Sequence, residues 1–458
     1  MRSQTLPVLI WCLCWSMGLL GQSTPNLQNP LPAAPNPAPE TTVSKTEQHP
    51  LPIVARLGIK DAESTALKNN PAISVVRLNA LASQQVVREV RSSFWPQAYA
   101  NLTAVEARNS SRITAGALNN PIIYTRAAGG GTVSQLITDF GHSTNLLASA
   151  RLQAKADDQN AVATKEDVLA AVDQAFYSAL QTHAVLRVAE QTVASRQLLS
   201  DQVGALTKSK LKSELDLSFA NVNLAQAKLL YLDALNNDKA AMASLSAILG
   251  YPTLENFELV GDSEALAPPP ADVEQLIADA FAKRPEILAL EFESESAEKM
   301  HAADRDQMLP TISALAAFGD SPIRDDRVYG PYSAVGVNVQ IPVFNGFLYS
   351  ARSHEAEIRA QATRQRLLDL RNRISRDVRT AWLTASTAFD RVNVSQQLLA
   401  QANLALELAQ TRYKLGLSSI VELSQAQLQQ TQAEIGSAQA ESEYRLALAM
   451  LRYQTAGL

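Results

Sequence analysis

The chain has 458 residues, enough for two or three domains, and a formal net charge of −5 at pH 7. This acidic balance argues against a nucleic acid as the main partner, because a polyanion is bound by basic surfaces. Aromatic residues make up only 6% of the chain, a proportion that suits closely packed helices better than the core of a large globular enzyme.

The N-terminus predicts an export signal. Arg2 precedes the apolar run Leu6–Leu20, which is too short for a spanning helix, and a small residue at Gly21 or Ser23 offers a cleavage site. Two alternatives are an N-terminal membrane anchor and a lipoprotein modified at Cys14. Both cysteines of the chain lie in this segment, so the mature protein would have no disulfide framework and no thiolate metal site.

The next segment is rich in Pro, Asn and Thr between Pro25 and Pro52. Such a composition cannot bury enough apolar surface to fold, so it predicts a disordered, extended tether. Beyond it, no uninterrupted apolar stretch approaches the ~20 residues that a membrane-spanning helix needs.

The remaining chain is duplicated. The stretch IKDAESTALKNNPAISVVR (59–77) aligns without gaps to VEQLIADAFAKRPEILALE (273–291), and LKSELDLSFA (211–220) aligns to LSSIVELSQA (417–426). The matches keep their order along the chain, which indicates two copies of one structural unit. The predicted organisation is a signal peptide (1–23), a Pro-rich tether (24–56), repeat 1 (57–252), an inter-repeat linker (253–272) and repeat 2 (273–458).

Each repeat has the same order of elements. A helix of about seven turns ends at Trp95-Pro96 or at Leu309-Pro310, because proline removes a donor and restricts the residue before it. Two alternating segments then predict strands with one apolar and one polar face. The clearest of them is AVGVNVQIPV (334–343). The predicted strands are about 97–107, 130–138, 311–319 and 333–343.

Long helices follow the strands. No proline occurs from His142 to about Leu206 or from Leu348 to about Leu415, and heptad-spaced apolar residues in both stretches predict pairing with other helices. Each would extend over roughly 100 Å if continuous. Return helices are predicted over about 214–249 and 420–456.

A duplicated helix–strand–strand–long helix–helix unit behind an export signal resembles the TolC family of outer-membrane efflux proteins. The resemblance covers about residues 57–456 and includes the two helix-ending prolines, the turns at Asp139-Phe140-Gly141 and Phe344-Asn345-Gly346, and the stretch RYKLGLSSIVEL. It implies a mainly α fold with a membrane β-barrel. In such a fold three subunits share one barrel, each donating four strands, and the long helices form a periplasmic α-helical tunnel.

The implied function is the outer-membrane channel of a tripartite efflux or type I secretion system in a Gram-negative-type bacterium. The channel would be a passive conduit, and its partners would be two further copies of the chain, a periplasmic adaptor, an inner-membrane pump and outer-membrane lipids. The alternative is a soluble periplasmic coiled-coil scaffold or adaptor without a pore. No nucleophile elbow, zinc-binding motif, phosphate loop or catalytic pair occurs in the sequence, so we expect neither an enzyme nor a cofactor.

The resemblance places the periplasmic gate at the two breaks between long and return helices, about 207–216 and 413–425. It implies a pore constriction of Glu422, Gln425 and Asp216, where Gln425 replaces an acid of the family pattern. It implies a latch between Tyr413 and Asp216, with Ser418 where some members have an arginine. Adaptor docking would use Gly416, Leu417, Ser418, Leu211 and Lys210. The alternatives are that Glu422 is a solvated acid at a helix N-terminus, and that Lys208, Lys210 and Lys212 form a solvated turn.

Overall fold

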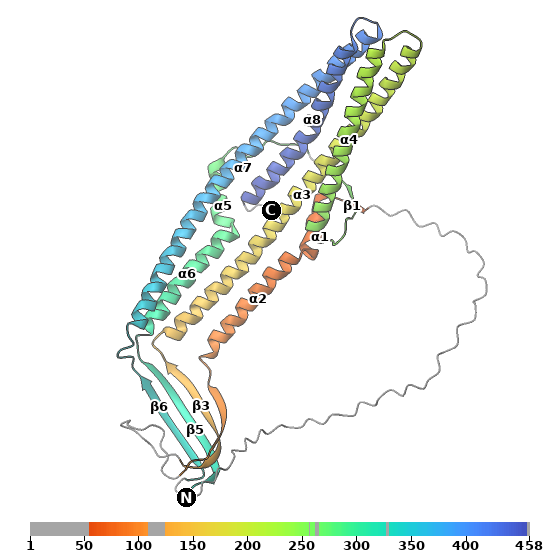
Figure 1. The fold of residues 1–458 in the computed structure, drawn as a ribbon. Coiled ribbons are helices and arrows are strands. Elements are labelled where there is room, and N and C mark those ends of the chain that lie inside the picture. The colour runs from red at the N-terminus through yellow and green to blue at the C-terminus, as the bar shows by residue number, and fades with distance from the viewer. Residues whose placement is uncertain (1–54, 109–123, 256, 262–264, 327–328, 456–458) are drawn as a thin grey trace, which may run out of the picture. The chain divides into compact units, whose positions relative to one another are not determined.

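The structure is a computed structural model that describes residues 55–108, 124–255, 257–261, 265–326 and 329–455. The predicted signal peptide and residues 24–54 of the predicted tether lie outside the described residues. In chain order the elements are β1 (Ala55–Leu57), α1 (Ile59–Asn69), α2 (Pro71–Ser92), β2 (Gln97–Val105), β3 (Arg126–Thr138), α3 (His142–Lys208), α4 (Glu214–Ile248), β4 (Phe257–Leu259), α5 (Val273–Lys283), α6 (Pro285–Asp306), β5 (Thr311–Arg324), β6 (Tyr332–Gln340), α7 (Leu348–Lys414) and α8 (Ile420–Gln454) (Figure 1).

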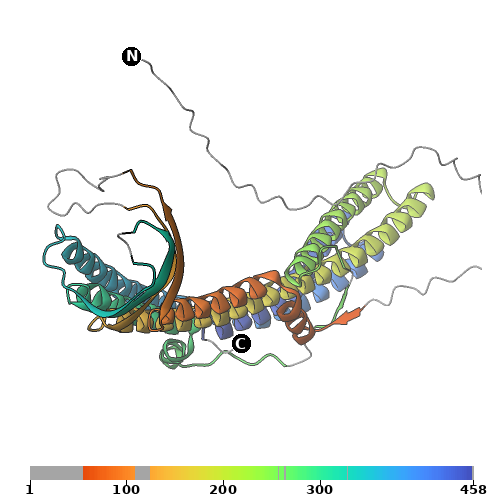
Figure 2. The ribbon, with the colours of Figure 1, turned by 90° about the horizontal axis from the view of Figure 1, so that it is seen from below.

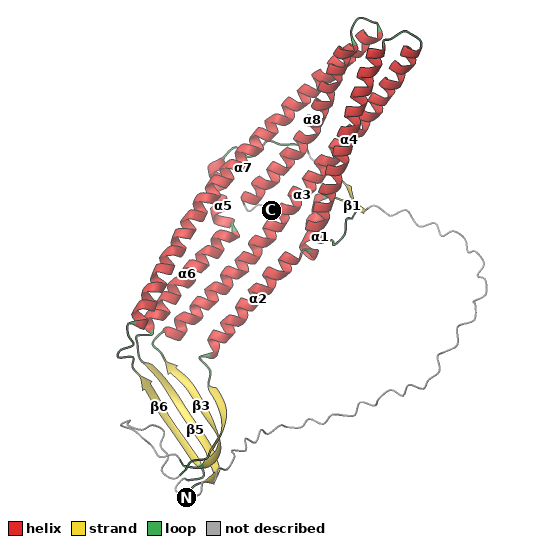
Figure 3. Ribbon diagram, in the orientation of Figure 1, coloured by secondary structure: helices red, strands yellow, loops and turns green. Residues whose placement is uncertain are grey.

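The two repeats fold into the same order of elements. The paired helices have equal lengths: 11 residues in α1 and α5, 22 in α2 and α6, 67 in α3 and α7, and 35 in α4 and α8. Helices dominate the fold (Figure 3). Among the described residues, none of them is both long and apolar enough to cross a membrane.

Four strands, two from each repeat, form one antiparallel sheet in the order β2-β3-β5-β6. Figure 2 shows that these strands curve together. The repeats meet in the centre of the sheet, where β3 pairs with β5. A second, parallel pair joins β1 to β4.

The strand ends show where local sequence chemistry acts. β3 begins at Arg126 and therefore includes the three glycines 129–131, and β5 continues to Arg324. β6 ends at Gln340 rather than near residue 343, because Pro342 has no N–H to donate to a neighbouring strand.

The long helix α3 buries most of the apolar seam that its heptad spacing predicts. α3 packs against α2, α4, α6 and α8, and α7 packs against α6 and α8. On α3 the heptad positions Val172, Ala179 and Ala189 have no exposed surface. The many buried alanines let neighbouring helices approach closely, so the hydrophobic core is a series of small clusters along the helices.

Each repeat has an elbow between its first two helices. Asn70 and Arg284 are both extended, and each precedes a proline that begins the next helix. The side-chain amide of Asn70 donates to the carbonyl of Ile248 at 3.1 Å, so the first elbow is tied to the end of α4. The guanidinium of Arg284 donates to Gln454 Oε1 at 2.8 Å, which ties the second elbow to the end of α8.

Candidate gate at the helical hairpin tips

The two hairpins, α3–α4 and α7–α8, turn with the same backbone chemistry. Lys210 and Gly416 occupy equivalent positions and both have positive φ angles, 60° and 73°. In the first tip the N–H of Leu211 donates to the carbonyl of Leu206 at 2.9 Å, and in the second the N–H of Leu417 donates to that of Arg412 at 2.8 Å. This Schellman pattern satisfies the last carbonyls of each long helix, so both tips are built turns.

The return helices begin at matching serine caps. The N–H of Asp216 donates to the Ser213 hydroxyl at 3.1 Å, and that of Glu422 donates to the Ser419 hydroxyl at 3.4 Å. The Asp216 carboxylate also accepts from the N–H of Ser213 at 3.2 Å and so completes a capping box. Asp216 therefore has a structural role in its own hairpin.

Glu422 has a different partner from its equivalent in the first tip. Its carboxylate lies 3.3 Å from Nε of Arg412, a residue on the last turn of α7. Both side chains are exposed, so this ion pair contributes little to stability. Gln425 lies one turn further along the exposed side of α8. Glu422 and Gln425 therefore share a face, and Arg412 supplies a counter-charge that the sequence did not reveal.

Tyr413 is buried at the second tip among Ile420, Leu423 and Ala426. Within the described residues, its hydroxyl has no hydrogen-bond partner. Burial raises the pKa of this hydroxyl, and the nearby charge of Asp216 raises it further. The structure thus brings the two predicted latch residues near each other without a hydrogen bond between them.

Lys212 contacts Tyr413 in a way that the sequence did not indicate. Its ammonium lies 4.0 Å from the centroid of the Tyr413 ring, the geometry of a cation–π contact. One lysine of the cluster at the first tip therefore packs on the second tip, and this contact joins the two hairpins.

The predicted docking residues lie on the surface of both tips. Leu211 is 71% exposed and Leu417 is 67% exposed, and Lys210 and Gly416 are also exposed. Ser418 differs, because its hydroxyl is buried and lacks a partner within the described residues. Leu215, Leu415 and Val421 extend this apolar surface.

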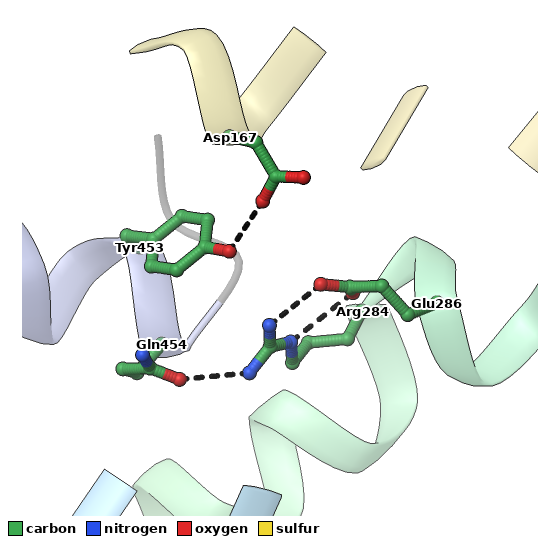
Figure 4. Close-up of polar contacts among 5 residues, drawn as sticks. All are labelled: Asp167, Arg284, Glu286, Tyr453 and Gln454. Carbon is green, nitrogen blue, oxygen red and sulfur yellow. Dashed lines mark hydrogen bonds and ion pairs between the residues drawn. The ribbon is translucent and has the colours of Figure 1, made fainter. Parts of the chain in front are cut away.

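A polar cluster around the buried side chain of Arg284 holds the opposite end of α8. Arg284 donates through Nε and a terminal nitrogen to both carboxylate oxygens of Glu286, at 3.2 and 2.6 Å (Figure 4). Tyr453, next to the Arg284 partner Gln454, donates its hydroxyl to Asp167 on α3. Burial raises the pKa of the Tyr453 hydroxyl, and the hydrogen bond to Asp167 adds to the shift. The cluster connects α8 with both repeats.

Comparison with known proteins agrees with this architecture. Residues 63–251 and 276–457 match the family described as outer membrane efflux protein. The outer membrane efflux protein BepC of Brucella suis is 22% identical over 82% of this chain and 80% of its own length. The outer membrane protein OprJ of Pseudomonas aeruginosa is 24% identical over 84% and 80%. The CmeC outer membrane channel of Campylobacter jejuni has the same fold, with a TM-score of 0.76 at 16% identity over 87% of this chain and 85% of its own.

Proposed function

The chain belongs to the outer membrane efflux protein family, and from this premise we propose that it is a passive outer-membrane conduit gated at its hairpin tips. Solutes would pass from the periplasm to the exterior, and an inner-membrane pump would supply the energy. Membership of a family of channel proteins favours this function over that of a pore-free periplasmic scaffold. It also gives no support for an enzymatic activity.

The surface of the four-stranded sheet carries this proposal. Val335, Val337 and Val339 alternate along β6 and are 87%, 65% and 53% exposed. A row of exposed valines would be unfavourable in water, but it suits contact with lipid hydrocarbon. β2 and β6 are the outer strands of the described sheet, so each offers an edge to another strand. Edge pairing between three copies would satisfy these backbone groups in one shared barrel.

The gate would lie at the two hairpin tips. Three symmetry-related Glu422 carboxylates around one axis would repel one another and attract cations into the aperture. Gln425 on the same face and Asp216 in the first tip complete the proposed constriction. Arg412, 3.3 Å from Glu422, would moderate its charge. The hydroxyl of Tyr413 is free to bond to Asp216 when the tips approach, and this bond is the proposed latch.

The periplasmic adaptor would dock on the exposed tips. The proposed contact residues are Gly416, Leu417, Ser418, Leu211 and Lys210. Exposed leucines at equivalent positions of both hairpins support this assignment, because an apolar surface repeated on both tips suits a partner that contacts both.

Single-channel conductance in planar bilayers tests the gate. Replacing Glu422 with Ala should change the conductance and weaken the preference for cations. Glu214→Ala is the matched control, because Glu214 is an exposed acid at the first tip outside the proposed constriction. Unchanged conductance in Glu422→Ala would refute the assignment of Glu422.

Cell fractionation tests the channel itself. A heat-sensitive trimer in the outer-membrane fraction is the expected result. A periplasmic monomer extracted by urea would instead support the scaffold.

A further inference from the structure

A cavity of about 330 Å³ lies beside α3, away from the hairpin tips, between α1, α8 and residues 265–267. Two carboxyl groups line it, Asp173 of α3 and Glu63 of α1. Three cations also line it: Lys60 of α1, and Arg445 and Arg452 of α8. Arg445 is already paired with Glu441 at 3.0 Å. The tyrosines Tyr177 and Tyr444 complete its polar lining, and the Tyr444 hydroxyl donates to the carbonyl of Ala267.

Asp173 is unusual for an aspartate because it is only 3% exposed. Its Oδ1 is buried and receives no hydrogen bond from any described N–H or O–H group. An ionised carboxylate in this position would lack the donors that normally compensate for burial. A protonated carboxyl is satisfied more easily, since it can donate to the Glu63 carboxylate. Burial, together with the charge of Glu63 and its hydrogen bond, raises the pKa of Asp173 to about 7.

Arg452 offers the ionised form a second partner. Its side chain is exposed, and its guanidinium forms no ion pair within the described residues. The charge of Arg452 lowers the pKa of Asp173, whereas the charge of Glu63 raises it. Tyr453 follows Arg452 in α8, and its hydroxyl is hydrogen-bonded to Asp167 on α3 (Figure 4). The backbone that carries Arg452 is therefore held beside α3 in either protonation state.

We propose that Asp173 is a proton-operated switch that exchanges partners between two helices. The protonated carboxyl is hydrogen-bonded to Glu63 and joins α3 to α1. The ionised carboxylate is repelled by Glu63 and turns to Arg452, so that α3 is joined to the C-terminal end of α8. Lys60 also lines the cavity, and it neutralises Glu63 when the shared proton is lost.

The sign of the pH effect follows from the direction of the shift. The unfolded chain loses the Asp173 proton near the usual value of 3.8, whereas the folded chain keeps it up to about pH 7. Between these values the folded state binds more protons than the unfolded state, so the stabilisation from this site decreases as pH rises. Above about pH 7 both states are ionised and no further loss occurs.

Thermal unfolding of the purified full-length chain in detergent, measured at a series of pH values, tests the switch. Asp173→Asn mimics the protonated carboxyl and cannot titrate. The unfolding temperature of the wild type minus that of Asp173→Asn should therefore decrease from pH 4 to pH 7 and stay constant above pH 7. A flat difference over the whole range would overturn the proposal.

Two partner variants separate a switch from a purely structural contact. Glu63→Gln removes the repelling charge, so the transition should move to lower pH by about one unit. Arg452→Gln removes the partner of the ionised form, so the transition should move to higher pH. Shifts of both variants in one direction would refute the exchange of partners. If Asp173→Asn does not fold, the two partner variants can still be compared with the wild type alone.

Hydrogen exchange gives the matching structural readout. Amides of α1 should exchange faster in the wild type than in Asp173→Asn at pH 8 and equally fast at pH 5. Comparing the two proteins at the same pH cancels the intrinsic pH dependence of exchange. Equal protection of α1 at both pH values would contradict the loss of the contact between α1 and α3.

Discussion

Gly250, at the end of α4, is a position where an added methyl group should be costly. Its φ angle is +86°, and its N–H donates to the carbonyl of Ala247 in the turn that ends the helix. A Cβ at this position would lie 2.8 Å from the backbone oxygen of Asn69, beside the first elbow. Backbone cannot rotate away as a side chain can, so the elbow itself would have to move.

The cost of Gly250→Ala has two parts. The left-handed conformation costs a residue with a Cβ about 1–2 kcal/mol. Forcing extra volume into a packed contact costs a further 1–3 kcal/mol, roughly. We therefore expect Gly250→Ala to lower the free energy of unfolding by about 2–5 kcal/mol.

Two other glycines separate these parts. Gly416 has a φ of +73° but open space around its Cβ position, so Gly416→Ala should cost only the conformational term, about 1–2 kcal/mol. Gly436 lies inside α8 with nothing within 4 Å, and Gly436→Ala should stabilise the helix by about 0.5–1 kcal/mol.

Chemical denaturation of the three variants, followed by far-ultraviolet circular dichroism, measures this order directly. The expected ranking of the denaturation midpoints is Gly436→Ala above the wild type, then Gly416→Ala, then Gly250→Ala. A Gly250→Ala variant as stable as Gly416→Ala would show that the contact with Asn69 carries no energy.

Two further predictions concern polar groups. Tyr413→Phe should leave the free energy of unfolding unchanged or raise it by up to about 1 kcal/mol, because the buried hydroxyl has no partner within the described residues; a loss above about 2 kcal/mol in the same denaturation assay would reveal a bonded hydroxyl. If the latch to Asp216 operates in the assembled channel, the same variant should also raise the conductance of the closed state. Arg284→Ala should cost about 2–3 kcal/mol, less than for a fully buried pair because Glu286 is 27% exposed. Arg284→Lys should restore only part of this loss, since an ammonium group cannot form the bidentate contact with Glu286. Full restoration would show that the bidentate geometry does not contribute to stability.

The sequence indicated the two hairpin tips as the candidate gate but not the contacts that are made there. The turn at Gly416 and the caps at Ser213 and Ser419 follow from local rules on helix ends, which involve residues close together in the chain. The contacts between Arg412 and Glu422 and between Lys212 and Tyr413 cross from one helix to another. No spacing rule links such residues, so they became visible only when the hairpins were placed together.

The same division holds for the rest of the molecule. The duplication, the long helices, the strands and the helix-ending prolines can be predicted from the sequence, because periodicity and backbone chemistry act over a few neighbouring residues. Which polar groups become partners across helices depends on how the helices pack in the folded chain. Arg284 and Gln454 are 170 residues apart in the chain, and the position of the second elbow at the end of α8 brings them together. Asp173 lies beside Glu63 and the arginines of α8 because α3 packs against α1 and α8. Burial removes water from these side chains, so their charges and hydrogen bonds depend on neighbours that only the folded chain supplies.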